Sequence, residues 1–221
     1  MRLFDVLGPV MIGPSSSHTA GAARIGRTAR QLLGEAPLRA DIGLYGSFAT
    51  TGRGHGTDRA IVAGLLDMKP DDPRLPDSFA LAEEAGMEFV IHSVELRAAH
   101  PNTAVLTLEG KRRKLSLTAA SVGGGRIRVT SIDGVSADFG GDANTLIIHN
   151  EDTPGCIAEV TRALAARRIN IASMQVFRSA PGGEAVMVLE CDSHIPADLE
   201  PQLGAVSGIH KVTCLNVDDT P

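Results

Sequence analysis

The chain has 221 residues, 43% of them hydrophobic, and a formal net charge of −5. These values suit one large or two modest folded domains and exclude a disordered chain. An acidic chain with no Trp and one Tyr lacks the basic surface and stacking rings typical of nucleic-acid binding. No apolar run approaches the roughly 20 residues of a membrane-spanning helix, so no membrane role is expected.

The N-terminus is interpreted as mature protein and not as a signal peptide, because Asp5 interrupts its apolar stretch. Cys156, Cys191 and Cys214 are widely spaced, odd in number and contain no C-x-x-C pair, which argues against a disulfide framework. We therefore expect a cytoplasmic protein.

The first part of the chain is predicted to mix helices and strands. Apolar residues recur at helical spacing from Ala22 to Leu33 and predict a helix over residues 19–33, ended by Gly34. A buried strand over 40–48, a glycine-rich loop over 51–58, a helix over 58–68 and a short helix over 78–85 are expected next.

From Met87 onward the pattern changes to alternation of β-branched and polar residues. Strands are predicted over 87–96, 103–110, 113–122 and 126–134, with a basic hairpin tip around 109–114. The stretch DFGGDAN, residues 138–144, is interpreted as a linker.

The last part of the chain is predicted to be a compact ferredoxin-like unit in the order βαββαβ. Its strands are expected over 144–152, 170–180, 183–192 and 210–217, and its helices over 153–168 and 196–209. Thr153 is predicted as the N-cap of the first of these helices, with Pro154 at the first helical position.

The stretch GPSSSHTAG, residues 13–21, gathers hydroxyls beside one imidazole at the start of a helix. A helix N-terminus offers unpaired N–H groups and a partial positive charge, which suit a carboxylate or a phosphate. The candidate anion ligands are Ser15, Ser16, Ser17 and Thr19, and His18 would lie in the first turn. An ordinary helix cap is the alternative, although one serine would be enough for it.

The stretch GRGHGTD, residues 52–58, is open to two interpretations. Gly54 and Gly56 would let the backbone approach a ligand closely beside His55, or they form only a tight turn. The G-K-[ST] ending of a phosphate-binding loop is missing.

Two shorter motifs follow. HPNT, which contains His100 and Asn102, is turn chemistry or part of a site. SVGGG, which contains Gly124, indicates a bulge or bend between strands or a further loop of the site.

The ordered set GPSSSHTAG, LYGSFATTGRGHGTD, HPNT and SVGGG, followed by the βαββαβ unit, resembles the β subunit of iron–sulfur-dependent L-serine dehydratases over essentially the whole chain. The C-terminal unit resembles an ACT domain. The resemblance implies an α/β (α+β) fold, with a serine dehydratase β-type domain over 1–142 and an ACT domain over 143–221. The first domain is also similar to the allosteric substrate-binding domain of some 3-phosphoglycerate dehydrogenases.

The resemblance further implies that L-serine is deaminated to pyruvate and ammonia with a [4Fe–4S] cluster as Lewis acid. In that family the cluster cysteines belong to a separate α subunit, which would be the partner of this chain. The three cysteines here are scattered, whereas cluster sites use grouped thiolates, so no metal is expected in this chain.

A pyridoxal-phosphate route to the same products needs a lysine Schiff base. The lysines are Lys69, Lys111, Lys114 and Lys211, and no phosphate-cradling loop lies near them. We therefore expect no pyridoxal phosphate.

On the resemblance, the serine-rich stretch and Asn102 would hold the substrate carboxylate. His18, His55 and His100 are the candidate bases, because histidine titrates near neutral pH. The sequence does not choose among the three, or between them and a residue of the α subunit.

The ACT-like unit has a candidate effector site in Asn150, Asp152, Gly155 and Asn170. In ACT domains such a loop commonly binds an amino acid at a domain–domain interface, and the alternative is a loop that only supports homodimerisation. The alternative for the whole chain is a non-catalytic, amino-acid-sensing regulator.

Overall fold

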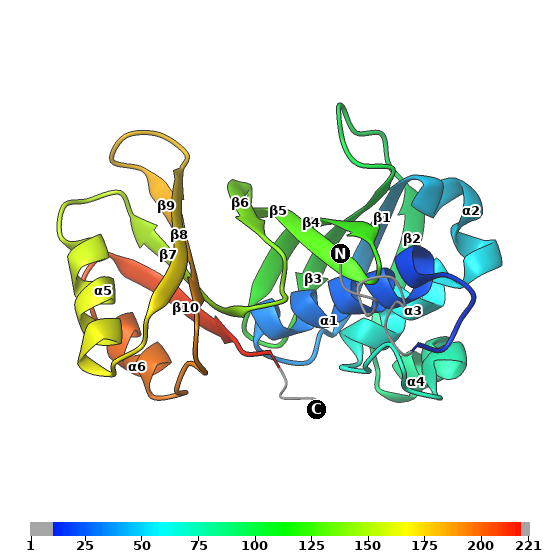
Figure 1. The fold of residues 1–221 in the computed structure, drawn as a ribbon. Helices are drawn as coiled ribbons and strands as arrows, with labels where there is room; N and C mark the ends of the chain where they lie inside the picture. Colours follow the sequence, from blue (N-terminus) through cyan, green and yellow to red (C-terminus); the bar gives the residue numbers. More distant parts are fainter. Residues whose placement is uncertain (1–10, 218–221) are drawn as a thin grey trace. The chain divides into compact units, whose positions relative to one another are not determined.

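The computed structural model describes residues 11–217 of the chain. The chain divides after Asp133 into two compact units. Figure 1 labels their helices and strands.

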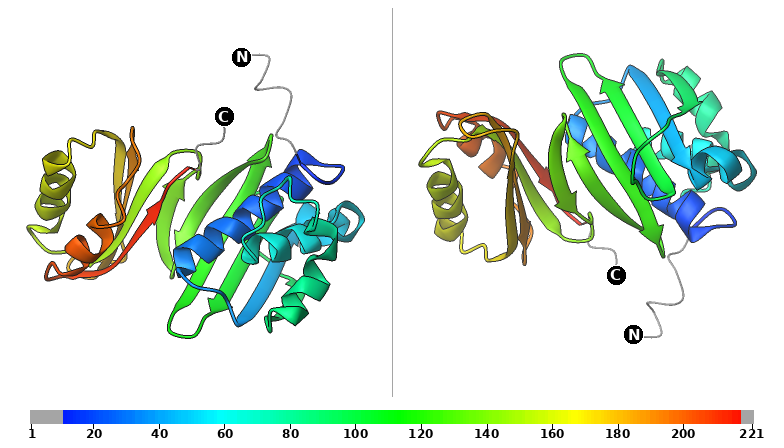
Figure 2. Two further views of the ribbon diagram at one scale, coloured as in Figure 1. Left: turned by 90° about the horizontal axis from the view of Figure 1, so that it is seen from below. Right: turned by 90° about the horizontal axis from the view of Figure 1, so that it is seen from above.

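The first unit combines a mixed sheet with helices that gather on one face of it (Figure 2). Within this unit the strands follow the order β2-β1-β3-β4-β5; β1 and β2 are parallel, whereas β1–β3, β3–β4 and β4–β5 are antiparallel. The elements of this unit are η2 (Ser16–Gly21), α1 (Ala22–Leu33), β1 (Arg39–Gly46), α2 (Ser47–His55), α3 (Thr57–Leu65), η3 (Leu75–Asp77), α4 (Ser78–Glu84), β2 (Glu88–Ser93), β3 (Asn102–Glu109), β4 (Lys114–Gly123) and β5 (Arg126–Ile132).

Alternation along the strands explains why one face of this sheet is covered. Ile42 lies opposite Leu106, which lies opposite Leu117, and all three side chains are fully buried. Because side chains on a strand point alternately to the two faces, these positions form the floor beneath the helices.

Helices α1 and α3 pack backbone against backbone at two glycines. A Cβ on Gly64 would lie 2.1 Å from the carbonyl oxygen of Ala23, and one on Gly26 would lie 2.2 Å from that of Ile61. This close crossing holds α1, and therefore the turn η2 that precedes it, against the rest of the unit.

The glycine-rich loop expected over residues 51–58 is wrong. Residues 51–55 form the second half of helix α2, and Gly56, with φ +70°, is the left-handed junction to α3. Glycine costs a helix about 1 kcal/mol relative to Ala, and at Gly52 an ideal Cβ would lie 3.2 Å from Thr57 Cβ, so a larger residue would require Thr57 to shift by a few tenths of an ångström. Tertiary packing therefore overrides local propensity.

The linker expected over residues 138–144 is also wrong in part, because strand β6 (Val135–Phe139) occupies its beginning. Asp133 and Gly134 both have positive φ, +50° and +80°. This is the conformation of a two-residue hairpin turn, for which Asp-Gly is a preferred pair. The compact units divide at this turn, ahead of the expected domain limit at residue 142.

The second unit has the expected ferredoxin-like order. After β6 come β7 (Asn144–Glu151), α5 (Cys156–Ala166), β8 (Ile171–Arg178), β9 (Glu184–Cys191), α6 (Leu199–Gly204) and β10 (Ile209–Leu215). The antiparallel sheet has the order β10-β7-β9-β8, and α5 and α6 lie on one side of it (Figure 1). Its core includes Leu146, Val160, Leu164, Met187 and Leu203.

The predicted helix cap of α5 is corrected by the structure. The helix begins at Cys156 with Gly155 as its N-cap, two residues after the predicted cap Thr153. Gly155 has φ +104°, a conformation that L side chains rarely adopt, so the chain enters the helix through the glycine.

Among residues 11–217, no helix is long and apolar enough to cross a membrane.

Candidate active site

The serine-rich stretch forms the π-helical turn η2, which continues directly into α1. Ser15 is its N-cap: its backbone is extended, and its Oγ accepts a hydrogen bond from the His18 amide at 3.1 Å. The amide of Thr19 donates to the Ser15 carbonyl at 2.8 Å. The helix therefore starts before residue 19, and Ser16, Ser17 and His18 lie in its first turn.

This turn lies directly against the sheet. An ideal Cβ on Gly21 would be 2.1 Å from Oγ of Ser121 on β4. Ser121 is fully buried, and its Oγ has no hydrogen-bond partner among the described residues. The small residue at Gly21 thus lets a strand hydroxyl reach the base of the turn.

His18 is surrounded by hydroxyls from helix α2. Its Nε2 lies 3.1 Å from Ser47 Oγ and 3.0 Å from Thr51 Oγ1, and its Nδ1 lies 3.4 Å from Ser15 Oγ. The ring also makes an edge contact with Phe48, at 5.4 Å between centroids. Helix α2 and the start of turn η2 thus hold the imidazole in place.

Burial lowers the pKa of His18, and the neighbouring His55 lowers it further, although the backbone at Ser47 opposes the shift. The physical cause is that a partly buried imidazolium loses hydration and meets a second potential positive charge. His18 is therefore neutral near pH 7 and able to accept a proton.

His55, at the end of α2, is brought to the same place. Its ring centroid lies 5.0 Å from that of His18, and its carbonyl accepts a hydrogen bond from Thr19 Oγ1 at 3.1 Å. Its Nδ1 is buried without a partner among the described residues, as is Oγ1 of the neighbouring Thr57. Unpaired buried polar atoms are uncommon and mark places where water or a ligand completes the bonding.

The HPNT turn lies beside the start of α2, because strand β3 pairs with strand β1. Asn102 pairs with Gly46 across β3 and β1, and the Pro101 carbonyl accepts a hydrogen bond from the Phe48 amide at 3.4 Å. His100 is exposed, and its Nδ1 accepts the Asn102 amide at 3.1 Å. Asn102 Oδ1 is buried without a partner among the described residues.

The three loop glycines show no close approach within this chain. Gly54 lies exposed on α2, Gly56 is the helix junction, and Gly124 lies in the β4–β5 hairpin with φ +61°. An ideal Cβ on any of them meets no atom within 4 Å. Backbone conformation accounts for Gly56 and Gly124, and nothing in the structure requires glycine at position 54.

Ser47, Phe48 and Thr51 were not among the sequence candidates, although they contact His18. Their signal was the segment GSFATTG, in which Ser47 and Thr51 are four residues apart and therefore share one face of a helix. The sequence pattern predicted Ser47 and Phe48 at the end of a strand and Thr51 in a glycine-rich loop, so the helical spacing was missed.

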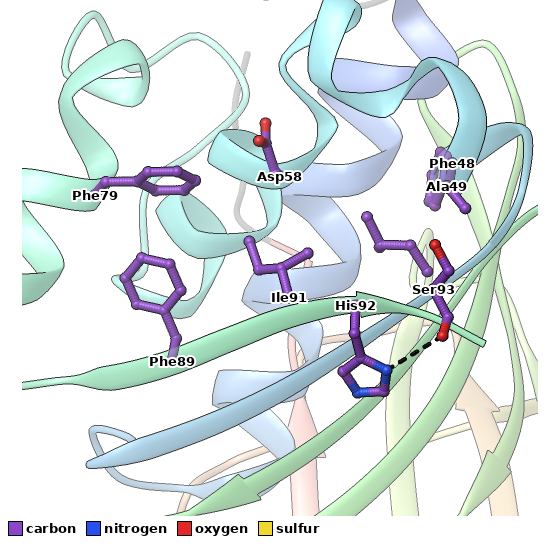
Figure 3. A pocket seen from close by; sticks show the side chains of 9 residues that line it. Phe48, Ala49, Asp58, Phe79, Phe89, Ile91, His92 and Ser93 are labelled. Atoms are coloured by element: carbon purple, nitrogen blue, oxygen red, sulfur yellow. Dashed lines mark hydrogen bonds between the residues drawn. The ribbon is translucent and has the colours of Figure 1, made fainter.

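A cavity of about 590 Å³ lies at the ends of the parallel strands β1 and β2 (Figure 3). Phe48, Phe79, Phe89 and Ile91 form apolar walls, and Asp58 supplies one carboxylate. None of the sequence-predicted site residues lines it, and only Phe48 also touches His18. Asp58, His92 and Ser93 give this cavity a polar as well as an apolar lining, but it is separate from the serine-rich turn at which the anion pocket is expected.

The candidate effector residues of the second unit are placed at two ends of its sheet. Asn150 is buried and donates to the Glu151 carbonyl at 2.6 Å, near the loop that holds Asp152 and Gly155. Asn170 lies at the other end, because Ile171 and Asn144 both pair with Cys191. The structure therefore does not bring all four together within one chain.

Asp152 and Asn170 are already bonded. The Asp152 carboxylate accepts from Arg178 Nη1 at 2.8 Å and from the Gly182 amide at 3.1 Å, and these bonds lower its pKa. Asn170 Nδ2 donates to the Asp192 carboxylate at 2.6 Å. By contrast, Asn150 Oδ1 is buried without a partner among the described residues.

The cysteines have the wrong chemistry for a metal cluster. Cys156 and Cys191 are buried, burial raises the pKa of Cys191, and it raises the pKa of Cys214 to about 11. Cluster ligands are thiolates, whereas burial favours the thiol form of Cys191 and Cys214. In the described part of the chain, no group of three or more His, Cys, Asp or Glu side chains is arranged to hold a metal ion.

Comparisons with known proteins identify both units. A family described as "Serine dehydratase beta chain" matches residues 3–84, and the family described as "ACT domain" matches residues 144–208.

The "Probable L-serine dehydratase, beta chain" of Bacillus subtilis is 42% identical over 211 residues, which cover 96% of this chain and 96% of that protein. The "L-serine dehydratase, beta chain" of Peptoniphilus asaccharolyticus is 32% identical over 95% of this chain and 94% of that protein. A "D-3-phosphoglycerate dehydrogenase" of Bacillus subtilis is 29% identical over 72% of this chain, but over only 30% of that protein.

Proposed function

Because this chain belongs to the family of L-serine dehydratase β chains, we propose that it is the β subunit of a two-chain, iron–sulfur-dependent enzyme that converts L-serine to pyruvate and ammonia. The observation that carries the proposal is the clustering of His18 and His55 with the serine-rich turn at the start of α1. We retain 1–142 and 143–221 as the proposed limits of its two domains.

The turn η2 would bind the substrate carboxylate. His18 and Thr19 use their amides within the turn, which leaves the amides of Ser16 and Ser17 as donors for an anion at the helix start. Their hydroxyls, with that of Ser15, would add further donors, and the side-chain amide of Asn102 would approach from the neighbouring sheet end.

His18 is the candidate base with the strongest support. Burial and His55 keep it neutral, and a neutral imidazole can remove the α-proton of serine. His55 would act by keeping His18 unprotonated before the reaction, since a positive charge on His55 opposes protonation of the neighbouring ring. His100 is the weakest candidate, because it is exposed and already accepts the Asn102 amide.

The residues of this chain do not fit a [4Fe–4S] cluster, because its cysteines are buried or half-buried thiols in the second unit. A cluster held by the α subunit would supply a Lewis acid for the serine hydroxyl. We infer that this chain contributes anion binding and proton transfer, and no metal ligand.

The ACT unit would regulate or dimerise the enzyme. The unpaired Asn150 Oδ1 supports a ligand at the β7–α5 loop. Because Asn170 lies at the opposite end of the sheet, a site using both residues would need a second copy of the chain.

The test is co-purification of this chain with its proposed α subunit under anaerobic conditions, followed by a pyruvate assay on L-serine. We expect pyruvate only from the pair. Pairs that assemble with a cluster but release no pyruvate would overturn the proposal.

Two matched histidine variants test the site. His18→Gln should abolish turnover while leaving assembly intact, whereas His194→Gln, at an exposed position of the second unit, should leave turnover unchanged. Equal turnover in the two variants would remove His18 from the active site.

A further inference from the structure

The distances around His18 indicate toward which atoms the neighbouring hydroxyl groups direct their protons. Thr51 Oγ1 lies 2.8 Å from the Ser47 carbonyl, which can only accept a hydrogen bond. Because this contact is shorter than the 3.0 Å between Thr51 Oγ1 and His18 Nε2, we place the single hydroxyl proton of Thr51 on the carbonyl side. Toward His18 Nε2, Thr51 Oγ1 then accepts.

With the Thr51 proton placed there, Nε2 is the nitrogen that carries the ring proton. If Nε2 were unprotonated, its lone pair would face the lone pair of Thr51 Oγ1 at hydrogen-bond distance. Ser47 Oγ, 3.1 Å from Nε2 and 3.2 Å from Thr51 Oγ1, is compatible with this arrangement. It accepts from Nε2–H, and its own proton is free to point toward Thr51.

We infer that Thr51 and Ser47 are positioning residues that fix His18 as the Nε2–H tautomer and so leave the proton-accepting lone pair on Nδ1. Nδ1 faces Ser15 Oγ at 3.4 Å, on the side of the serine-rich turn. The tautomer itself does not depend on the proposed function, but the role of the lone pair rests on it. In that role, a substrate held by the turn would meet Nδ1 and not Nε2.

A tautomer is defined only for a neutral imidazole, and the surroundings of His18 favour its neutral form. Burial and His55 both lower the pKa of His18. His55, on α2, is the titratable side chain that faces the ring in the described part of the chain.

Helix α2 supplies a matched control at the next residue. Thr50 Oγ1 donates to the carbonyl of Gly46, four residues earlier, at 3.2 Å, just as Thr51 donates to that of Ser47. Thr50 differs in that it is not bonded to His18. A change that follows Thr51 but not Thr50 therefore reports the contact with the imidazole and not helix stability.

The experiment is two-bond proton–nitrogen correlation NMR on the full chain labelled at the histidine nitrogens, with His18 assigned from the spectrum of His18→Gln. In the wild type, Nδ1 should show the unprotonated shift and Nε2 the protonated one. Thr51→Val should change the tautomer ratio by about fivefold, the effect of losing one neutral hydrogen bond. Thr51→Ser should restore the ratio, and Thr50→Val should not alter it.

A wild-type His18 protonated on Nδ1 would overturn the inference even if Thr51→Val does not fold, and so would an unchanged ratio in a folded Thr51→Val. The NMR result does not depend on the reaction. An Nε2–H tautomer in a pair that makes no pyruvate contradicts the proposed function alone, and an Nδ1–H tautomer in an active pair contradicts this inference alone.

Discussion

Replacing Gly64 by Ala tests whether the backbone crossing of α1 and α3 supports the active-site turn. The added Cβ would lie 2.1 Å from the Ala23 carbonyl oxygen and 2.6 Å from the Arg27 nitrogen. Both are backbone atoms of α1 and cannot rotate away. Ordinary Cβ contacts need 3.4–4 Å, so α1 must move by more than about 1 Å to relieve the overlap.

The magnitude follows from two opposing terms. Ala is favoured over Gly inside a helix by about 1 kcal/mol, whereas overpacking typically costs about 1–3 kcal/mol and here falls at the upper end, because only backbone is contacted. We expect a net loss of about 2 kcal/mol, which lowers Tm by about 4–8 °C for a chain of this length. The shift of α1 should also displace His18 and reduce turnover of the reconstituted pair.

The assay is urea unfolding followed by tyrosine fluorescence. The chain has one Tyr and no Trp, and Tyr45 lies on β1, so the signal reports the first unit alone. Gly54→Ala is the control: it lies within α2 and an added Cβ there meets nothing within 4 Å, so it should stabilise by up to about 1 kcal/mol. A Gly64→Ala protein at least as stable as the wild type would refute the packing argument.

Three further results are expected. Gly46→Ala should lower the midpoint of urea unfolding by an amount equivalent to about 1–3 kcal/mol, because φ is +59° and the added Cβ would lie 2.6 Å from the Pro101 carbonyl; an unchanged midpoint would contradict this. Because the pKa of His18 is lowered in the folded state, the unfolded chain binds more protons between that pKa and about 6.5, and this contribution to stability falls as pH decreases through that window. The stability difference between wild type and His18→Gln, measured by urea unfolding from pH 7 to 5, should therefore vary with pH, and a constant difference would argue against it. Cys214, with a pKa of about 11, should react with iodoacetamide at pH 8 far more slowly in the native protein than in urea. Mass spectrometry of the labelled cysteine measures both rates, and equal rates would contradict the prediction.

Much of the fold could be predicted because its signals are local. Gly34 ends α1 in the left-handed conformation expected of a C-cap, with its amide bonded to the Arg30 carbonyl. The strands follow the alternation of apolar residues, and the βαββαβ order of the second unit is confirmed.

Part of the candidate site was also visible in the sequence. Serines, threonine and histidine concentrated at one helix start are a chemical signal that needs no partner from elsewhere, and the structure places Ser15 as the N-cap with His18 in the first turn. The helix start was misplaced because a π-helical turn has no distinctive sequence pattern. Its last residue, Gly21, packs closely against Ser121 of a distant strand, a contact that no local pattern encodes.

What only the tertiary structure decided was which side chains meet. The spacing of Ser47 and Thr51 gains its meaning from a helix that local glycine content disfavours, and that helix brings both hydroxyls to His18 about thirty residues away in sequence. Helix and strand periodicity are properties of neighbouring residues, so the sequence alone determined the elements and the kinds of chemistry available. The pairing of imidazole with hydroxyls, the separation of Asn170 from Asn150 and the glycine crossing of α1 and α3 depend on long-range packing, which no local pattern encodes.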